Sequence, residues 1–271
     1  MVGTHGRGIW ILDQISALQE VSPEVLARPA HLFPIRAAEQ IRYDRQIAHS
    51  GDLHYEGENP PTGAILDYWL ATEHPGGEGL EITVHDAGGE RIARIGDAPG
   101  RAGMNRAIWD LRHSLPEDED EGEEEEPRRF RPRGPFVVPG TYTVRLTADG
   151  ATSEAPVEVR EDPRIEVDPA ARRAWTATLL ELAEMGRTAE ERTERAEALL
   201  ERLEEEGAGP GEVEEARALH GEWDELRSRI LRLAGDVSDW VGPLTGDQRS
   251  RLDFYREMIG TLTEELEAAG G

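Results

Sequence analysis

The sequence of 271 residues contains no cysteine and no lysine, and aromatic residues make up only 6% of it. Without cysteine the chain can form neither disulfides nor thiolate metal sites, although this does not decide its compartment. No run of about 18 apolar residues occurs, so we expect no membrane span. The first eight residues also lack the apolar stretch of a signal peptide, so any secretion signal is expected upstream.

Acidic residues dominate the charge, with 56 Asp and Glu against 30 arginines and a net charge of −26. This excess would repel a phosphate backbone, and no basic stripe offsets it, so we expect no nucleic-acid partner. The same sign disfavours an anionic membrane surface. Two interpretations of the composition stay open: GC-biased coding with adaptation to salt, and an acidic surface built for a cationic partner.

Residues 1–13 predict one β-strand that is entered through a glycine-rich turn and has no partner before it. Because an unpaired strand exposes a row of N–H and C=O groups, we expect this segment to be the tail of a longer fold. Any catalytic apparatus would then lie upstream of it. Residues 14–27 are expected to form a short helical connector, in which Ser22 precedes Pro23 as an N-cap does.

Residues 28–164 alternate short apolar runs with turn residues, which predicts an antiparallel β-sandwich. No helical pattern of crossover length separates the runs, so βαβ units are not expected, and glycines fill the intervening turns. Trp109 and Tyr142 are expected to supply large side chains to the core. The seven expected strands are 31–43, 62–72, 79–86, 90–96, 105–113, 141–148 and 155–161.

An acidic insertion interrupts this region at residues 116–135. Nine of the ten residues from 117 to 126 are carboxylates, which repel one another and should stay solvated. The first interpretation is therefore a disordered surface loop, partly neutralised by the four arginines that follow. A calcium site is the alternative, because hard cations prefer oxygen ligands, but the run lacks the spaced Asp, Asn and Gly residues of a calcium loop.

Residues 165–271 have the apolar period of helices, which predicts an antiparallel bundle of three helices joined by glycine and proline turns. Asp168 and Pro169 match the N-cap and first position of the first helix. Thr245 with Gln248 would form a capping box for the third. The expected seams are Trp175, Leu179, Leu182, Gly186, Ala189, Thr193, Ala196, Leu200 and Leu203, then Leu219, Trp223, Leu226, Ile230, Leu233 and Val237, then Leu252, Tyr255, Ile259, Leu262 and Leu266.

No residue is assigned a catalytic, cofactor-binding or metal-binding role from the sequence. No GxSxG, SxxK or P-loop motif occurs, and the glycine-rich segment 3–8 precedes a strand rather than the helix that a phosphate cradle needs. Carboxylates are so numerous that no pair is singled out for glycoside hydrolysis. The eight histidines show no zinc spacing and are interpreted as scattered surface residues. They are His5, His31, His49, His54, His74, His85, His113 and His220.

One alternative to scattered histidines is a metal cluster, since His49 and His54 lie close to Asp52 and Glu56 in the sequence. Imidazole and carboxylate groups are common metal ligands. The cluster stays a second interpretation because its spacing matches no known motif.

Three segments of the chain resemble a known family. GMNRAIWDLR at 103–112, followed by VVPGTYTVRL at 137–146, resembles the immunoglobulin-like sandwich appended to many bacterial surface and secreted proteins. The opening VGTHGRGIWILD is similar to the closing strand of β-propellers built from bacterial neuraminidase (BNR) repeats. It resembles in particular the sortilin-type propeller proteins often labelled glycosyl hydrolases. In that family the propeller is followed by a connector, a sandwich with segments like NPPTGA at 59–64 and WDLR, and a helical tail, in the order found here.

The resemblance implies a non-catalytic accessory or interaction region of such a propeller protein, which would be secreted or periplasmic. Its partner would be the propeller or another protein surface, and no cofactor is implied. The SxDxGxTW aspartate-box repeats are missing here, so no catalytic residue can be transferred. The implied domains are 1–13, the last propeller strand; 14–27, the connector; 28–164, the immunoglobulin-like sandwich; and 165–271, the three-helix bundle.

Two rival functions stay open. The chain could be a glycosidase with an unrecognised carboxylate pair, or a binding module for carbohydrate or protein. Trp and Tyr side chains gathered on an exposed sheet face would favour the binding module, whereas their burial in the core would favour the accessory region.

Overall fold

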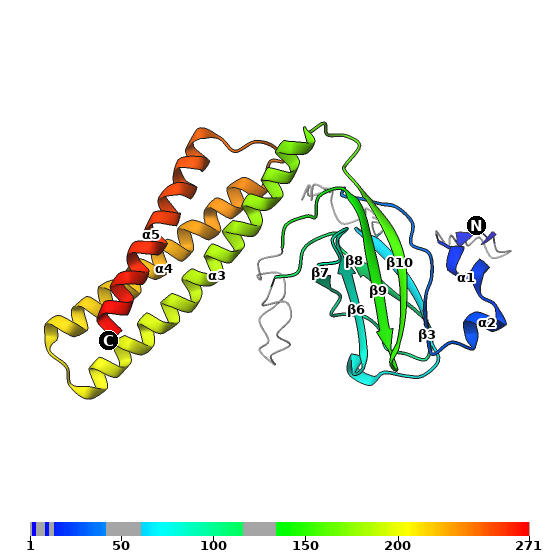
Figure 1. Ribbon diagram of the computed structural model, residues 1–271, viewed down its shortest axis with the longest axis horizontal. Coiled ribbons are helices and arrows are strands. Elements are labelled where there is room, and N and C mark those ends of the chain that lie inside the picture. The colour runs from blue at the N-terminus through cyan, green and yellow to red at the C-terminus, as the bar shows by residue number, and fades with distance from the viewer. Residues whose placement is uncertain (1, 4–8, 11–13, 42–60, 116–133, 271) are drawn as a thin grey trace, which may run out of the picture. The chain divides into compact units, whose positions relative to one another are not determined.

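Figure 1 shows the computed structural model of the chain, which describes residues 2–3, 9–10, 14–41, 61–115 and 134–270. The chain is an α+β protein, as expected, with β-sheets in its first part and three long helices after them. Its internal contacts divide it into two compact units, Met1–Ile165 and Glu166–Gly271.

The N-terminal segment is not the single unpaired strand expected from the sequence. Val2–Gly3 (β1) pairs antiparallel with Ile9–Trp10 (β2), with Val2 opposite Trp10. The prediction was wrong because it treated the glycine-rich stretch as the entrance to one strand, not as a connection between two. A two-stranded ribbon still leaves both of its outer edges available for pairing.

The connector contains two short helices, Ser16–Glu20 (α1) and Pro23–Leu26 (α2). Ser22 caps α2, because its hydroxyl accepts a hydrogen bond from the backbone N–H of Val25 at 3.4 Å. This confirms the N-cap expected from the serine and proline pair.

Two larger sheets follow in the first unit. One is antiparallel with the strand order β3-β5-β8, and the other has the order β4-β10-β9-β6-β7. Strands β9 and β10 of the second sheet also contact β3 of the first. The strands are Ala30–Leu32 (β3), Ala38–Glu39 (β4), Ala64–Leu70 (β5), Leu80–His85 (β6), Arg91–Arg94 (β7), Gly103–Trp109 (β8), Gly140–Ala148 (β9) and Ala151–Arg160 (β10), with a short 3₁₀ turn at Pro75–Gly77 (η1).

Every expected strand region contains a strand, but the first region is split between the two sheets. Strand β3 belongs to the antiparallel sheet, and β4 pairs parallel with β10, Ala38 lying opposite Val159. Pro34 lies between the halves and has no N–H to donate to a ladder. The five-stranded sheet is therefore mixed, and the expectation of wholly antiparallel pairing was wrong for this pair.

The core of the first unit contains Trp109, whose side chain is only 1% exposed. Its indole N–H donates to the carbonyl of Arg112 at 3.0 Å, and its ring packs edge-on against Tyr142 with centroids 5.6 Å apart. Tyr142 is half-buried and its hydroxyl donates to the carbonyl of Val138 at 2.6 Å. The expected core role of Trp109 is confirmed, and Tyr142 lies at the border of that core.

Tyr68 of β5 provides a pH-dependent prediction. It is fully buried, its hydroxyl donates to the carbonyl of Pro99 at 2.5 Å, and burial raises its pKa to about 12. An unfolded tyrosine ionises near pH 10. The stability that Tyr68 contributes is thus present below pH 10 and is lost as the pH rises towards 12, by about 2 kcal/mol.

Tyr68→Phe should therefore flatten the alkaline loss of stability, because phenylalanine cannot ionise. Urea denaturation at pH 9 and pH 11.5 measures this loss in both proteins. Equal losses of unfolding free energy in the wild type and the variant would show that Tyr68 ionises as easily in the folded as in the unfolded chain.

The second unit consists of Pro169–Glu206 (α3), Pro210–Ser238 (α4) and Gly246–Gly270 (α5), which contact one another pairwise (Figure 1). Asp168 caps α3 by accepting hydrogen bonds from two backbone N–H groups at 2.9 and 3.0 Å, and Gly207 ends it with φ of 69°. Both boundaries are as expected. Within the described ranges no helix is both long and apolar enough to cross a membrane.

Contacts between residues far apart in the sequence give the directions of these helices. Trp175 near the start of α3 donates from its indole N–H to the carbonyl of Val237 near the end of α4, at 2.8 Å. Glu204 near the end of α3 pairs with Arg217 near the start of α4, at 2.7 Å. Helices α3 and α4 therefore run antiparallel.

The expected helical seams are largely buried, but the seam of α3 shifts near its end. Leu199 is buried at 7% exposure, whereas Leu200, expected in the seam, is half-buried. Thr193 is also half-buried, and its hydroxyl donates to the carbonyl of Ala189 at 2.8 Å. An α-helix has 3.6 residues per turn, whereas spacings that alternate between four and three average 3.5, so the predicted seam rotates slowly around the helix. After Ala196 the next buried residue is therefore Leu199, three positions later, and not Leu200.

Candidate functional site

A polar groove of about 470 Å³ lies on the five-stranded sheet. In β6, Ile82 and Val84 are buried in the core, so the residues that alternate with them point to the opposite face. This face carries the groove. Its lining residues are Glu81, Thr83 and His85 from β6, Arg91 from β7, Arg145 and Thr147 from β9, and Thr152 and Glu154 from β10.

The strand register brings these side chains together in cross-strand rows. Arg145 in the central strand β9 lies opposite Glu154 on one side and opposite Thr83 on the other. In the next row, Thr147 lies between Thr152 and Glu81 in the same way. Directly opposite residues have Cβ atoms about 5 Å apart, so polar groups from three strands meet within one hollow.

The floor of the groove is a buried hydrogen-bonded pair. Thr83 is 5% exposed and His85 9% exposed, although both point away from the core. The Nδ1 atom of His85 lies 3.2 Å from the carbonyl oxygen of Gly89, and its Nε2 atom lies 3.0 Å from the hydroxyl of Thr83. A carbonyl only accepts, so Nδ1 carries the proton and, in the neutral ring, Nε2 accepts from Thr83.

The walls of the groove hold two arginines and two glutamates. Arg145 donates from Nε to Glu154 at 2.7 Å, and Arg91 lies 3.9 Å from Glu81. The charges of the lining therefore balance, in contrast to the strongly acidic chain as a whole. Such half-exposed ion pairs stabilise a fold by less than about 1 kcal/mol, so their positions are set mainly by the register of the strands.

His74 is the other buried histidine among those that the structure describes, and its side chain connects neighbouring loops. Its Nδ1 atom lies 3.0 Å from the carbonyl oxygen of Glu78, and its Nε2 atom lies 3.5 Å from a carboxylate oxygen of Asp149. The same oxygen accepts a hydrogen bond from Thr72 at 2.5 Å. The interpretation of scattered surface histidines was thus wrong for His74 and for His85, because each is held by backbone carbonyls that the sequence pattern does not reveal.

The other histidines that the structure describes give no candidate site. His31 is half-buried in the middle of β3, where burial and then the charge of Arg28 lower its pKa. His113 and His220 are also half-buried. Among the residues that the structure describes, no group of three or more His, Asp or Glu side chains could hold a metal ion. His5, the alternative cluster of His49, His54, Asp52 and Glu56, and the acidic residues 117–126 lie outside the described residues.

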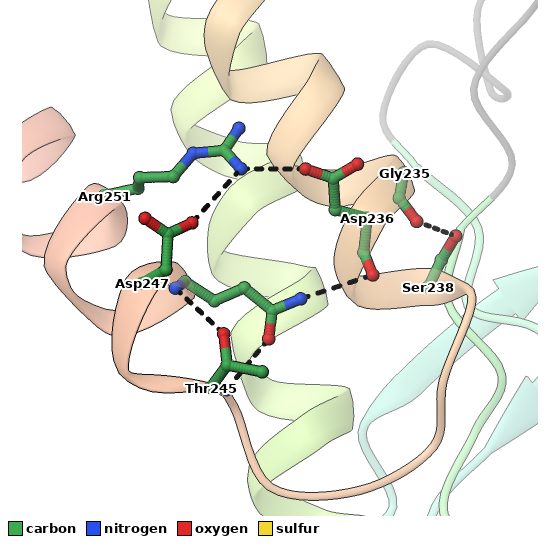
Figure 2. Close-up of polar contacts among 7 residues, drawn as sticks. Gly235, Asp236, Ser238, Thr245, Asp247 and Arg251 are labelled. Atoms are coloured by element: carbon green, nitrogen blue, oxygen red, sulfur yellow. Dashed lines mark hydrogen bonds and ion pairs between the residues drawn. The ribbon is translucent and has the colours of Figure 1, made fainter.

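The turn between α4 and α5 holds a second polar cluster (Figure 2). Arg251 lies between Asp236 and Asp247, at 2.8 and 3.8 Å from their carboxylate oxygens. The backbone N–H of Thr245 donates to the side chain of Gln248 at 2.9 Å, and the N–H of Gln248 donates to the hydroxyl of Thr245 at 3.2 Å. This confirms the expected capping box. The cluster joins two helix ends, so we assign it a structural role.

No protein-family model matches the chain, and no curated protein matches it either. Sequence reasoning missed the groove, although one signal was present: residues 81, 83 and 85 alternate polar side chains with the apolar residues of β6. That alternation marks an outward face, but only the strand register shows which strands complete the site.

Proposed function

We propose that this chain is a non-catalytic accessory region of a sortilin-type β-propeller protein of the kind often labelled a glycosyl hydrolase, and that it contacts the propeller or another protein surface. In this proposal the first unit is an immunoglobulin-like sandwich and the second is an antiparallel three-helix bundle. The observation that carries the accessory role is the burial of three large aromatic side chains in the first unit, those of Phe33, Tyr68 and Trp109.

Three large aromatic side chains of the first unit are buried, whereas Trp69 of β5 and Tyr142 of β9 are half-buried. Phe33, Tyr68 and Trp109 are each at most 1% exposed, and the polar atoms of Tyr68 and Trp109 bond to backbone carbonyls within the unit. A binding module that recognises its ligand through aromatic rings presents those rings on its surface. Burial of the rings supports a structural use of these residues.

Two further features support the immunoglobulin-like sandwich. In such folds one sheet has the strands A, B, E and D, and the other has G, F and C with C′ added in variable-type domains. The orders β3-β5-β8 and β10-β9-β6-β7 match A-B-E and G-F-C-C′ when the strands are taken in sequence, with no described strand in the place of D. Tyr142 near the start of β9, the equivalent of strand F, bonds back to Val138, as the tyrosine of a tyrosine corner does.

The three-helix bundle is supported by ion pairs and hydrogen bonds between its helices. Arg256 of α5 forms two hydrogen bonds with Glu181 of α3 at 2.7 and 2.8 Å. Arg227 of α4 bonds to Glu190 of α3 at 3.0 Å. Together with the antiparallel α3 and α4, these contacts fit an up-down-up arrangement.

The rival glycosidase would need two carboxyl groups, one of which keeps its proton to act as an acid. Among the residues that line the groove, Glu81 and Glu154 are the carboxylates, and each lies beside an arginine. The carboxylate of Glu154 accepts a hydrogen bond from Arg145 and is thus engaged within the sheet. This arrangement supports binding more than acid catalysis.

The proposal is tested by assaying the purified chain against aryl glycosides and sialosides. We expect no turnover above the buffer rate. The Glu81→Gln and Glu154→Gln variants serve as controls for contaminating activity, because a contaminant is unaffected by either change. A rate that persists through purification and disappears in one of these variants would establish the glycosidase in place of the accessory region.

A further inference from the structure

We propose that the polar groove on the five-stranded sheet binds a neutral polyhydroxyl compound of the size of a hexose or cyclitol. The inference does not depend on the function proposed above, because an accessory region and an independent module could both carry such a site. It rests on the buried floor, the free hydroxyl groups and the balanced charges of the groove.

The floor makes this groove a built site and not a chance hollow. A polar side chain that points away from the core is normally solvated, yet Thr83 and His85 are both more than nine-tenths buried there. Their mutual hydrogen bond and the bond of His85 to Gly89 fix both side chains in place. Fixed polar groups lose little freedom when a ligand binds, which favours binding.

Two hydroxyl groups in the row beside Thr83 are available to a ligand. Thr147 and Thr152 lie directly opposite each other on β9 and β10 and both line the groove. No hydrogen bond of either hydroxyl is found within the described residues. A threonine hydroxyl both donates and accepts, so the pair complements a ligand whose own groups are hydroxyls.

The charged groups of the walls place donors beside acceptors. Arg145 offers N–H donors and Glu154, 2.7 Å from it, offers carboxylate acceptors. Two neighbouring hydroxyls of a sugar or cyclitol can accept from the first and donate to the second, because each hydroxyl does both. Charge-assisted bonds of this kind are stronger than those between neutral groups.

The balance of charge selects against ionic ligands. Arg91 and Arg145 would attract an anion, but Glu81 and Glu154 line the same groove and repel it. A cation would be attracted by the two glutamates and repelled by the two arginines. A neutral ligand is repelled by neither pair. Because no Phe, Tyr or Trp is among the described residues that line the groove, binding would rest on hydrogen bonds, and we expect dissociation constants in the millimolar range, on the order of −4 kcal/mol.

The test is an NMR titration of the full chain with D-glucose, D-galactose and myo-inositol as neutral probes. Glucuronate, glucosamine and inorganic phosphate serve as charged probes. We expect saturable shifts of the Thr83, His85 and Arg145 amides with at least one neutral probe, and weaker binding of every charged probe. The amide spectrum also reports whether each protein is folded.

Thr147→Val is the diagnostic variant, because it removes one free hydroxyl and keeps a β-branched side chain in the strand. It should weaken binding of the neutral probe about fivefold, the equivalent of one neutral hydrogen bond. Thr141→Val is the matched control, since Thr141 is exposed on the same strand and does not line the groove. The affinity of the Thr141→Val variant for the neutral probe should equal that of the wild type.

Glu154→Gln tests the charge argument separately. Removing one carboxylate leaves the groove with an excess positive charge, so affinity for glucuronate should rise while affinity for the neutral probe falls. The proposal is overturned if no neutral probe gives saturable shifts at about 50 mM, a concentration beyond specific recognition. Tighter binding of a charged probe by the wild type, or equal effects of Thr147→Val and Thr141→Val, would overturn it as well.

Discussion

Gly63→Ala is expected to destabilise the first unit by more than about 3 kcal/mol. Gly63 has φ of +128°, a conformation that residues with a side chain rarely adopt. A Cβ atom on it would lie 2.1 Å from the carbonyl oxygen of Trp109. Because Ala64, the next residue, is paired with Trp109 in the register of β5 and β8, relief of the clash would separate the two strands at their first pair.

Gly96→Ala is the matched control in the same unit. Gly96 has no positive φ, and apart from its chain neighbours no described residue has an atom within 4 Å of the position of its Cβ. Its replacement should change the unfolding free energy by less than about 1 kcal/mol, and reduced freedom of the unfolded chain could make it slightly stabilising. Urea denaturation of the two variants makes the comparison. Similar stabilities would mean that the backbone at Gly63 adjusts without cost.

Ile230→Asp is expected to unfold the second unit. Ile230 in α4 is fully buried, and an unpaired carboxylate in such a place, together with the lost packing, costs about 4 kcal/mol or more. Far-UV circular dichroism should show a large loss of helix at 25 °C. The amide signals of the first unit should remain, because its core is separate from that of the helices.

Leu231→Asp is the control for this change, since it introduces the same residue at the next position of the helix. Leu231 is 39% exposed, so its carboxylate can stay solvated, and a loss of about 1 kcal/mol is expected. If Ile230→Asp also abolished the amide signals of the sheets, the two units would unfold cooperatively. The expected boundary near residue 165 would then not separate two independently stable domains.

Helix ends were predictable from the sequence because their signals are local. The caps at Asp168 and Thr245 and the left-handed Gly207 depend on one or two residues and on backbone groups within the same turn. The strand regions were found for a similar reason, since alternation is visible within a single strand. Leu200 was misplaced because small errors in helical period add up along a helix of 38 residues.

Features that depend on partners far away in the sequence could not be predicted. Residues 30–32 pair with β5, and residues 38–39 pair with β10 in the other sheet. The local sequence of the two segments does not indicate which of these strands each will pair with. The groove required the register of three strands, and its floor required the carbonyl of Gly89 to face His85. Each of these features depends on tertiary contacts, and the residues that form them have no fixed sequence spacing that a motif could describe.

The parallel pairing of β4 with β10 has a mechanical consequence. The chain enters β4 from β3 and leaves β10 towards α3, so the entrance and the exit lie at opposite ends of two adjacent parallel strands. A pulling force between these points would load their hydrogen bonds in shear, all at once, and not one after another as in unzipping. The N–H of Gln40, which bonds to the carbonyl of Arg160 at 3.0 Å, would share that load.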